Sequence, residues 1–292
     1  MLTKVRYPRI MVTRKINTLS NLLLNGYNKF YPLLIIFCLA FLIRSGHAGQ
    51  SYRIPFFQIL AIIGLVVIAV TLDSIILARL FSPEKKLIEV FKSNLVKVIG
   101  GGLTQILLLS AQTNSIPSNF ASRWKFLVSV NVVASAPFLI FLIFNPVKFQ
   151  GSNILLTSWF FLVLLVIFGH AHSHSSRTTL ISFLKLSPLA FASQLSASIA
   201  LLLCIGQGDF KILPFVVYMF LLSLIIPIPN GFLVRESYLY FVFSDLYAMR
   251  QVIIGSVLFR LVQFCIEFLL GVGSYLWSIL KRKKRSRSDI EK

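Results

Sequence analysis

The long apolar runs of this chain match the thickness of a lipid bilayer, and this match limits what the chain can fold into. A helix needs about 20 mostly apolar residues to cross the hydrocarbon core. Runs of this kind cover residues 55–80, 124–144, 153–168, 188–205 and 212–226, with a shorter run at 31–43 and a last long helix at about 249–280. The pattern predicts an all-α, polytopic transmembrane helical bundle.

Composition excludes a separate soluble domain. Hydrophobic residues make up 57% of the 292 residues, and the mean hydropathy is +0.82. No polar stretch reaches the roughly 50 residues that an independent domain usually needs. We therefore divide the chain into a basic cytoplasmic segment 1–30, an integral membrane domain 31–280 and a basic cytoplasmic tail 281–292. Any chemistry is expected at or in the bilayer.

The net charge of +20 comes from basic residues that flank the apolar runs, with short basic blocks at both ends of the chain. Such flanking charge orients membrane proteins and contacts lipid, so nucleic acid is not an expected partner. Two basic ends predict two cytoplasmic termini in the cell membrane, and hence an even number of spans. The clear runs give seven, so we expect the segment around Gly100 to cross as well, making about eight.

Two segments interrupt helical sequence at membrane depth. The first is the triple glycine at 100–102, and the second is an expected irregular stretch, 227–245, which contains Pro227, Pro229, Asn230 and Gly231. Irregular backbone inside a membrane is tolerated where it is buried in protein or lines a cavity. Paired broken or re-entrant segments, a possible internal repeat, are typical of transporter binding sites. The alternative is that these glycines permit close packing and the prolines only kink helices.

Charged residues follow the second interruption. Arg235 and Glu236 come directly after it, and Arg260 and Glu267 lie seven residues apart on the last predicted helix. That spacing places the last two on one helical face. Charge at membrane depth is costly and usually faces a protein interior or a wet cavity. These four residues either contact a ligand or form an ion-pair lattice that joins helices, and the sequence leaves both open.

Other candidate groups carry weaker signals. Asp73 lies late in a predicted span and is either an interfacial residue or a proton or cation site. The histidines of HAHSH have no accompanying carboxylate or cysteine and are read as an interfacial cluster, with no metal site expected. Nucleotide-binding and hydrolase motifs are missing, so no cofactor is expected.

The C-terminal pattern resembles the transmembrane region of lysylphosphatidylglycerol synthases, a flippase-like membrane family. Members typically show P-x-P-G-G-x-G-x-R-E, an apolar stretch, and then an Arg-Leu helix that ends near a glycine. The matching residues are Pro227, Pro229, Gly231, Arg235, Glu236, Arg260, Leu261 and Gly271, whereas Asn230 and Leu233 replace family glycines. The counterpart in the first half is residues 94–105, where Gln105 is the nearest polar residue to the glycines.

This resemblance implies that the protein handles lipid. The aminoacyl-transfer domain of fused members has no counterpart in these residues, so lysyl transfer is not predicted. The leading hypothesis is a translocase for an anionic phospholipid or a lipid-linked sugar in cell-envelope or polysaccharide synthesis. Arg235 and Arg260 would neutralise the headgroup, and Glu236 and Glu267 would orient the arginines. The alternatives are a membrane enzyme or subunit for lipid-linked glycosyl transfer, and a non-catalytic scaffold for envelope-synthesis partner proteins.

Overall fold

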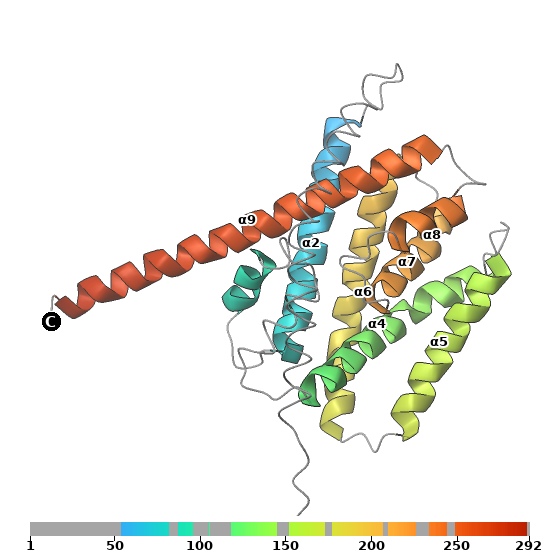
Figure 1. The fold of residues 1–292 in the computed structure, drawn as a ribbon, viewed down its shortest axis with the longest axis horizontal. Helices are drawn as coiled ribbons and strands as arrows, with labels where there is room; N and C mark the ends of the chain where they lie inside the picture. Colours follow the sequence, from blue (N-terminus) through green and yellow to red (C-terminus); the bar gives the residue numbers. More distant parts are fainter. Residues whose placement is uncertain are drawn as a thin grey trace, which may run out of the picture.

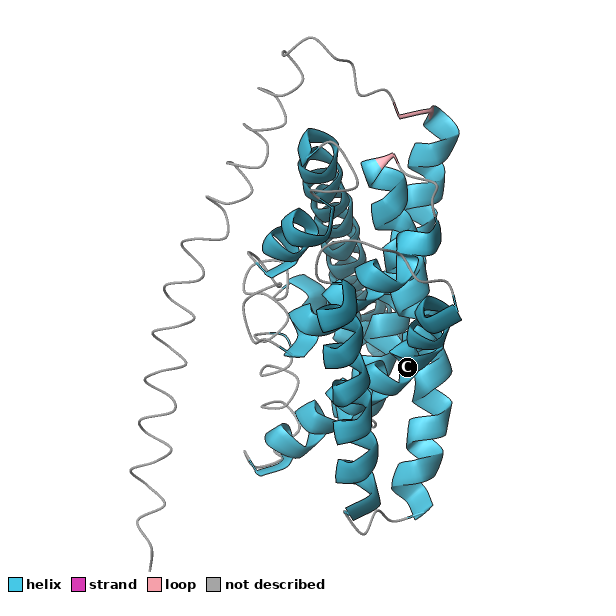
Figure 2. Cartoon of the chain, turned by 90° about the vertical axis from the view of Figure 1, so that its right-hand side faces the viewer, coloured by secondary structure: helices cyan, strands magenta, loops and turns pink. Residues whose placement is uncertain are grey.

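The structure is a computed structural model, and every regular element among its described residues is a helix (Figure 1). Figure 2 shows the same helices from the side. The prediction of an all-α chain is therefore confirmed for the described part. That part comprises residues 54–81, 87–95, 105, 118–144, 152–172, 177–206, 210–225, 234–243 and 249–290.

The described helices follow the apolar runs closely. They are α2 (Phe56–Phe81), α4 (Ser118–Phe144), α5 (Ser152–His172), α6 (Arg177–Ile205), the 3-10 turn η1 (Phe210–Ile212), α7 (Leu213–Ile225), α8 (Val234–Phe243) and α9 (Met249–Ile290). Residues 87–95 form a further helical segment between α2 and α4. The predicted run at 31–43 and the triple glycine at 100–102 lie outside the described residues.

Four helices are long and apolar enough to cross a membrane: Phe56–Leu80, Lys125–Phe144, Lys185–Ile205 and Gln251–Lys281. Two shorter apolar helical stretches, Leu156–Val166 and Leu213–Leu224, accompany them. At 1.5 Å per residue, 20 residues give about 30 Å, which is the thickness of the hydrocarbon core. The described residues thus agree with a helical membrane protein, although they do not reach the predicted count of about eight spans.

The outer surface of the bundle is apolar where a water-soluble protein would be polar. Phe57 is 82% exposed, Phe144 78% and Leu269 66%, and α2, α4, α5 and α9 all carry further exposed large apolar side chains. Apolar surface that extends over several helices marks contact with lipid or protein rather than water. This distribution supports the membrane assignment independently of helix length.

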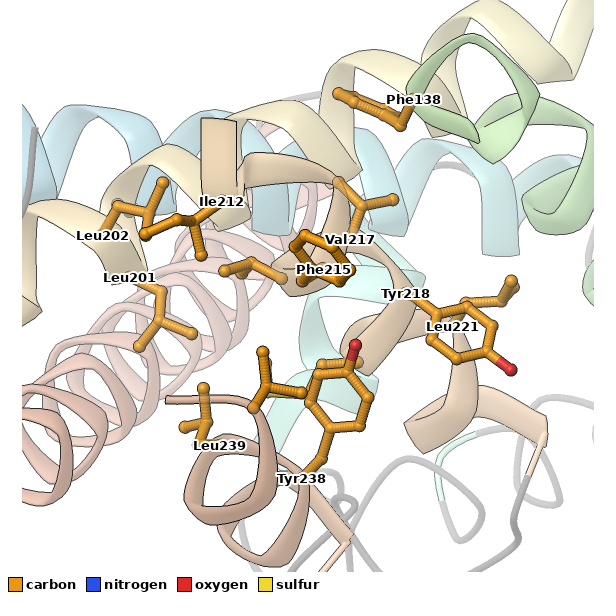
Figure 3. Packing of buried hydrophobic residues seen from close by; sticks show 14 of the residues in the cluster. Phe138, Leu201, Leu202, Ile212, Phe215, Val217, Tyr218, Leu221, Tyr238 and Leu239 are labelled. Carbon is orange, nitrogen blue, oxygen red and sulfur yellow. The ribbon is translucent and has the colours of Figure 1, made fainter. Parts of the chain in front are cut away.

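Helix α6 is the centre of the bundle and packs against α2, α4, α7 and α9 (Figures 1 and 2). The main buried cluster joins its last turns to α7 and α8, as the side chains in Figure 3 show for Leu201, Phe215 and Leu239. Helix α6 ends at Ile205, and the next residue, Gly206, has a φ of 78°, a left-handed conformation that glycine adopts without strain.

Helix α9 is the longest described helix, and it crosses α2 and α6 at a large angle to their axes (Figure 1). Its apolar part, Gln251–Lys281, has 31 residues. At 1.5 Å per residue this part is about 46 Å long, which exceeds the hydrocarbon thickness of about 30 Å. Tilting is one way for such a helix to fit the membrane, and the packing against α6 sets the direction of the tilt.

Glycines permit two close contacts of α9. A Cβ atom added at Gly255 would lie 2.6 Å from both the Cys204 carbonyl oxygen and the Ile205 Cα, so the backbones of α9 and α6 meet there. A Cβ at Gly271 would lie 2.6 Å from the Leu95 side chain and 3.2 Å from its backbone nitrogen. Gly271 therefore lets the helical residues 87–95 approach α9.

Two boundaries differ from the sequence-based expectation. We expected irregular structure over residues 227–245, but α8 (Val234–Phe243) occupies much of that stretch. The prolines and the glycine that indicated irregularity all precede α8, and buried side chains such as Leu239 and Val242 hold the helix against the bundle. Helix α9 continues to Ile290 instead of ending near 280, because Lys and Arg are good helix formers.

Substitution of Gly255 tests the crossing of α6 and α9. In Gly255→Ala the new methyl group meets backbone atoms that cannot rotate away, so the helices must separate. We expect a loss of about 1–3 kcal/mol of stability, measured as a lower midpoint of thermal unfolding in detergent. Gly64→Ala and Gly273→Ala are matched controls, because nothing lies within 4 Å of a Cβ at either position. A Gly255→Ala protein as stable as these controls would contradict the crossing.

Candidate functional site

Arg235 is held at the contact between α7 and α8. It lies in the first turn of α8, and its Nε donates a hydrogen bond to Ser223 Oγ on α7 at 3.2 Å. Its guanidinium carbon lies 4.7 Å from the centroid of the Phe220 ring, an arrangement that stabilises a cation over an aromatic face. The side chain is half-buried. The bundle therefore fixes a permanent positive charge among apolar helices.

Helix α9 carries a polar face within its apolar sequence. Gln263 Nε2 donates to Glu267 Oε1 at 2.8 Å, and Glu267 is only 3% exposed. Arg260 lies on the same helix and buries its Nε and Nη2 atoms. A buried carboxylate at membrane depth requires hydrogen-bonding or charged neighbours, and Gln263 supplies one of them.

An aromatic pair connects Arg235 to α9. The Phe220 ring, which lies under the Arg235 guanidinium, meets the Phe259 ring of α9 edge to face, with centroids 5.8 Å apart. Phe259 directly precedes Arg260 in α9. Helices α7, α8 and α9 thus meet around the Phe220 and Phe259 rings, with Arg235 on the α8 side. Gln263 lies one turn after Phe259 on the same face of α9, and we call this region, with the polar residues of α9, the α7–α9 site.

Gln105 belongs to a different, uncharged cluster. It is 1% exposed, and its Nε2 donates to Ser93 Oγ at 2.9 Å and to Asn94 Oδ1 at 2.6 Å. Asn94 Nδ2 makes a long contact of 3.5 Å with Ser74 Oγ on α2. Both hydrogens of the Gln105 amide are used in this way. The cluster connects Gln105 to the helical residues 87–95, and the geometry gives it a structural role in addition to the predicted contact with a ligand.

Asp73 is placed opposite α6. Ser193 Oγ lies 2.5 Å from Asp73 Oδ1 and 3.3 Å from the Ala69 carbonyl oxygen, so the hydroxyl hydrogen faces two acceptors on α2. The sequence analysis named Asp73 without a partner. The run of small residues around Ser193 could have indicated the partner, since small side chains allow helices in membranes to approach and hydrogen-bond.

A group of aromatic residues was also missed. The Trp159 and Tyr218 rings stack with centroids 5.1 Å apart, and Tyr238 meets Tyr218 edge to face at 6.1 Å. Figure 3 shows the two tyrosines side by side with their hydroxyl groups pointing in different directions. The Tyr218 hydroxyl shares a hydrogen bond of 2.8 Å with Ser158 Oγ. These rings connect α5, α7 and α8, and their sequence positions form no pattern that predicts the contact.

Several predicted residues cannot be placed. Pro227, Pro229, Asn230 and Gly231 lie outside the described residues, as does the side chain of Glu236, whose backbone is in α8. The same holds for the side chains of the histidine cluster at the end of α5. Among the described residues, no group of three or more His, Cys, Asp or Glu side chains is arranged to hold a metal ion.

Comparisons with protein-family models, with curated proteins and with solved structures found no match. The resemblance to the lysylphosphatidylglycerol synthase transmembrane region therefore stays a prediction from the motif residues.

Substitution of Gln105 tests the uncharged cluster. Gln105→Leu removes the donor to Ser93 and Asn94 and leaves buried polar atoms without this partner, which costs about 1–3 kcal/mol. The expected result is a lower unfolding midpoint in detergent. Gln251→Leu makes the same chemical change at an exposed position of α9 and is expected to have little effect. Equal midpoints for the two variants would show that Gln105 does not hold the cluster together.

Proposed function

We propose that the protein is a flippase-like lipid translocase that handles an anionic headgroup, carried by a phospholipid or a lipid-linked sugar. The observation that carries the proposal is the position of Arg235, which is half-buried and held by Ser223 and Phe220 inside an apolar bundle. A cation held among apolar helices is costly unless hydrogen bonds, an opposite charge or a bound ligand offset that cost. An anionic headgroup that enters from the membrane would be such a ligand.

The chemistry of phosphate fits the α7–α9 site. A guanidinium group binds phosphate through two parallel hydrogen bonds, and its charge persists at every physiological pH. In this proposal Arg235 and Arg260 supply two such groups, and Glu267, which accepts a hydrogen bond from Gln263, has the task of orienting Arg260. The acyl or isoprenoid tail stays in lipid throughout, so only the desolvation of the headgroup has to be offset. The proposal gives the same role to Glu236, the residue that follows Arg235 in the sequence.

Lipid movement in proteoliposomes tests the role of Arg235. Loss of a hydrogen bond to a charged group costs about 1.5–3 kcal/mol, so Arg235→Ala should slow the redistribution of a fluorescent anionic phospholipid at least about tenfold. Arg235→Lys should give an intermediate rate, because it keeps the charge but loses the planar fork. Lys281→Ala, which removes an exposed cation at the end of the α9 span, is the matched control. A wild-type rate in Arg235→Ala would rule out the site.

A scaffold function is the second candidate, and one observation favours it. Arg235 and Glu267 already have hydrogen-bonding neighbours within the bundle, as expected of residues that only lock helices together. The double variant Arg260→Glu with Glu267→Arg separates the two functions. If the two residues only lock helices together, the double variant should keep the function of the wild type. If they bind a headgroup, lipid movement should stay lost in the double variant.

We further propose that about eight helices cross the cell membrane and that both termini are cytoplasmic. The apolar part of α9 ends at Lys281, and the residues that follow are rich in Lys and Arg, which are retained on the cytoplasmic side. A fluorescent protein fused to either terminus should therefore fluoresce in cells, and alkaline phosphatase at the same positions should be inactive. Active phosphatase at one terminus would mean an odd number of spans.

A further inference from the structure

Three exposed cations mark the boundaries of three apolar spans. Arg79 is the next-to-last residue of the span in α2, and Lys125 and Lys185 are the first residues of the spans in α4 and α6. All three side chains are exposed. Each of them therefore stands where the apolar layer of its helix gives way to polar surroundings.

The second buried cluster of the bundle shows that these three helix ends lie together. Residues next to each cation in the chain belong to this one cluster, namely Ala78, Leu80, Phe126 and Leu186. Figure 1 likewise shows the end of α2 beside the beginnings of α4 and α6. Helices that are far apart in the sequence thus bring Arg79, Lys125 and Lys185 to one end of the bundle, which we call the basic end.

The carboxylates near the basic end are engaged with other groups. Among the described residues of α2, α4, α6 and 87–95, the acidic side chains are Asp73 and Glu89. Glu89 pairs with Lys92 at 2.8 Å, and Asp73 faces Ser193 on α6. No described residue forms an ion pair with any of the three cations of the basic end. This surface therefore has an excess of positive charge.

Helix α9 runs toward the same end of the bundle. Gly255 lies against the last turn of α6, whereas Gly271 lies against Leu95. Leu95 shares its short helix with Val90, a member of the second buried cluster. The basic tail that begins at Lys281 follows ten residues after Gly271, so it leaves the bundle on the side of the basic end.

We propose that the basic end binds the headgroups of anionic phospholipids in the adjacent leaflet of the membrane. Long basic side chains near the end of a span extend to the interface, where the lipid phosphates lie. An acidic protein would have to reach this level from outside, whereas lipid phosphates are already there. Lipid bound here is a fixed partner of α2, α4 and α6, distinct from the substrate that we propose for the α7–α9 site.

Thermal unfolding of the purified full chain in a nonionic detergent tests this proposal. Phosphatidylglycerol should raise the unfolding midpoint, whereas phosphatidylcholine at the same concentration should not. The triple variant Arg79→Gln/Lys125→Gln/Lys185→Gln should lose most of this shift, because each cation contributes about fivefold to the affinity for an anionic lipid surface. A wild-type response in the triple variant, or an equal response to phosphatidylcholine, would overturn the proposal.

Lys185→Gln and Lys211→Gln form a matched pair of single variants. Each removes one exposed lysine, but Lys211 lies in η1, beyond the opposite end of α6. Lys185→Gln should need about five times more phosphatidylglycerol for the half-maximal shift, and Lys211→Gln should respond as wild type does. Equal responses would mean that only net charge matters, which contradicts a localised site. This pair also decides the outcome if the triple variant does not fold.

Two further measurements identify the source of the phosphate and the place where it binds. Inorganic phosphate at the same concentration should leave the midpoint unchanged, and a shift as large as that with phosphatidylglycerol would overturn the assignment to lipid. The three substitutions should cause the same loss in an Arg235→Ala background. If Arg235→Ala alone already abolishes the shift, the lipid binds at the α7–α9 site and the basic end is not its binding site.

Discussion

Lipid offers no hydrogen bonds to the side chains that it surrounds, so each polar group of the bundle must find its partner within the protein. Several described polar groups follow this constraint. Ser193 faces Asp73, Gln105 faces Ser93 and Asn94, and further serines donate to carbonyl oxygens of their own helices. The contacts between helices, such as Ser193 with Asp73 and Gln194 with Asn131, help to fix which helices lie side by side, because apolar packing alone does not distinguish one helix from another.

The polar groups fall into two kinds with different consequences. The clusters of α2, α4 and α6 are built mainly from serines and amides, and their geometry accounts for most of their donors. The α7–α9 site contains full charges, and charges cost far more than amides to keep in an apolar environment. The burial of a charge at Arg235 therefore needs an explanation that the burial of the Gln105 amide does not. Helix locking is one explanation and an anionic headgroup is the other, and the two differ in how they respond to an exchange of charges.

Close approach of backbones is the second organising feature. Helix α9 crosses the end of α6 at Gly255 and meets residues 87–95 at Gly271, and in both places a side chain would occupy space that a neighbour already fills. Gly271 is also one of the residues that carry the family resemblance. Its contact with Leu95 gives that glycine a packing role within α9, which is a physical reason for a glycine there whatever the function of the protein.

The sequence by itself determined the class of fold and the positions of the main helices, because the length of an apolar run is a local property that the bilayer thickness selects. It also identified the charges of α8 and α9 as exceptional, since charge inside apolar sequence is visible without a structure. Only the tertiary structure decided their neighbours: that Phe220 lies under Arg235, that Gln194 faces Asn131 and that Gly255 lies against Cys204. Such contacts join residues far apart in the chain, and they depend on helix rotation and crossing, which no local pattern encodes.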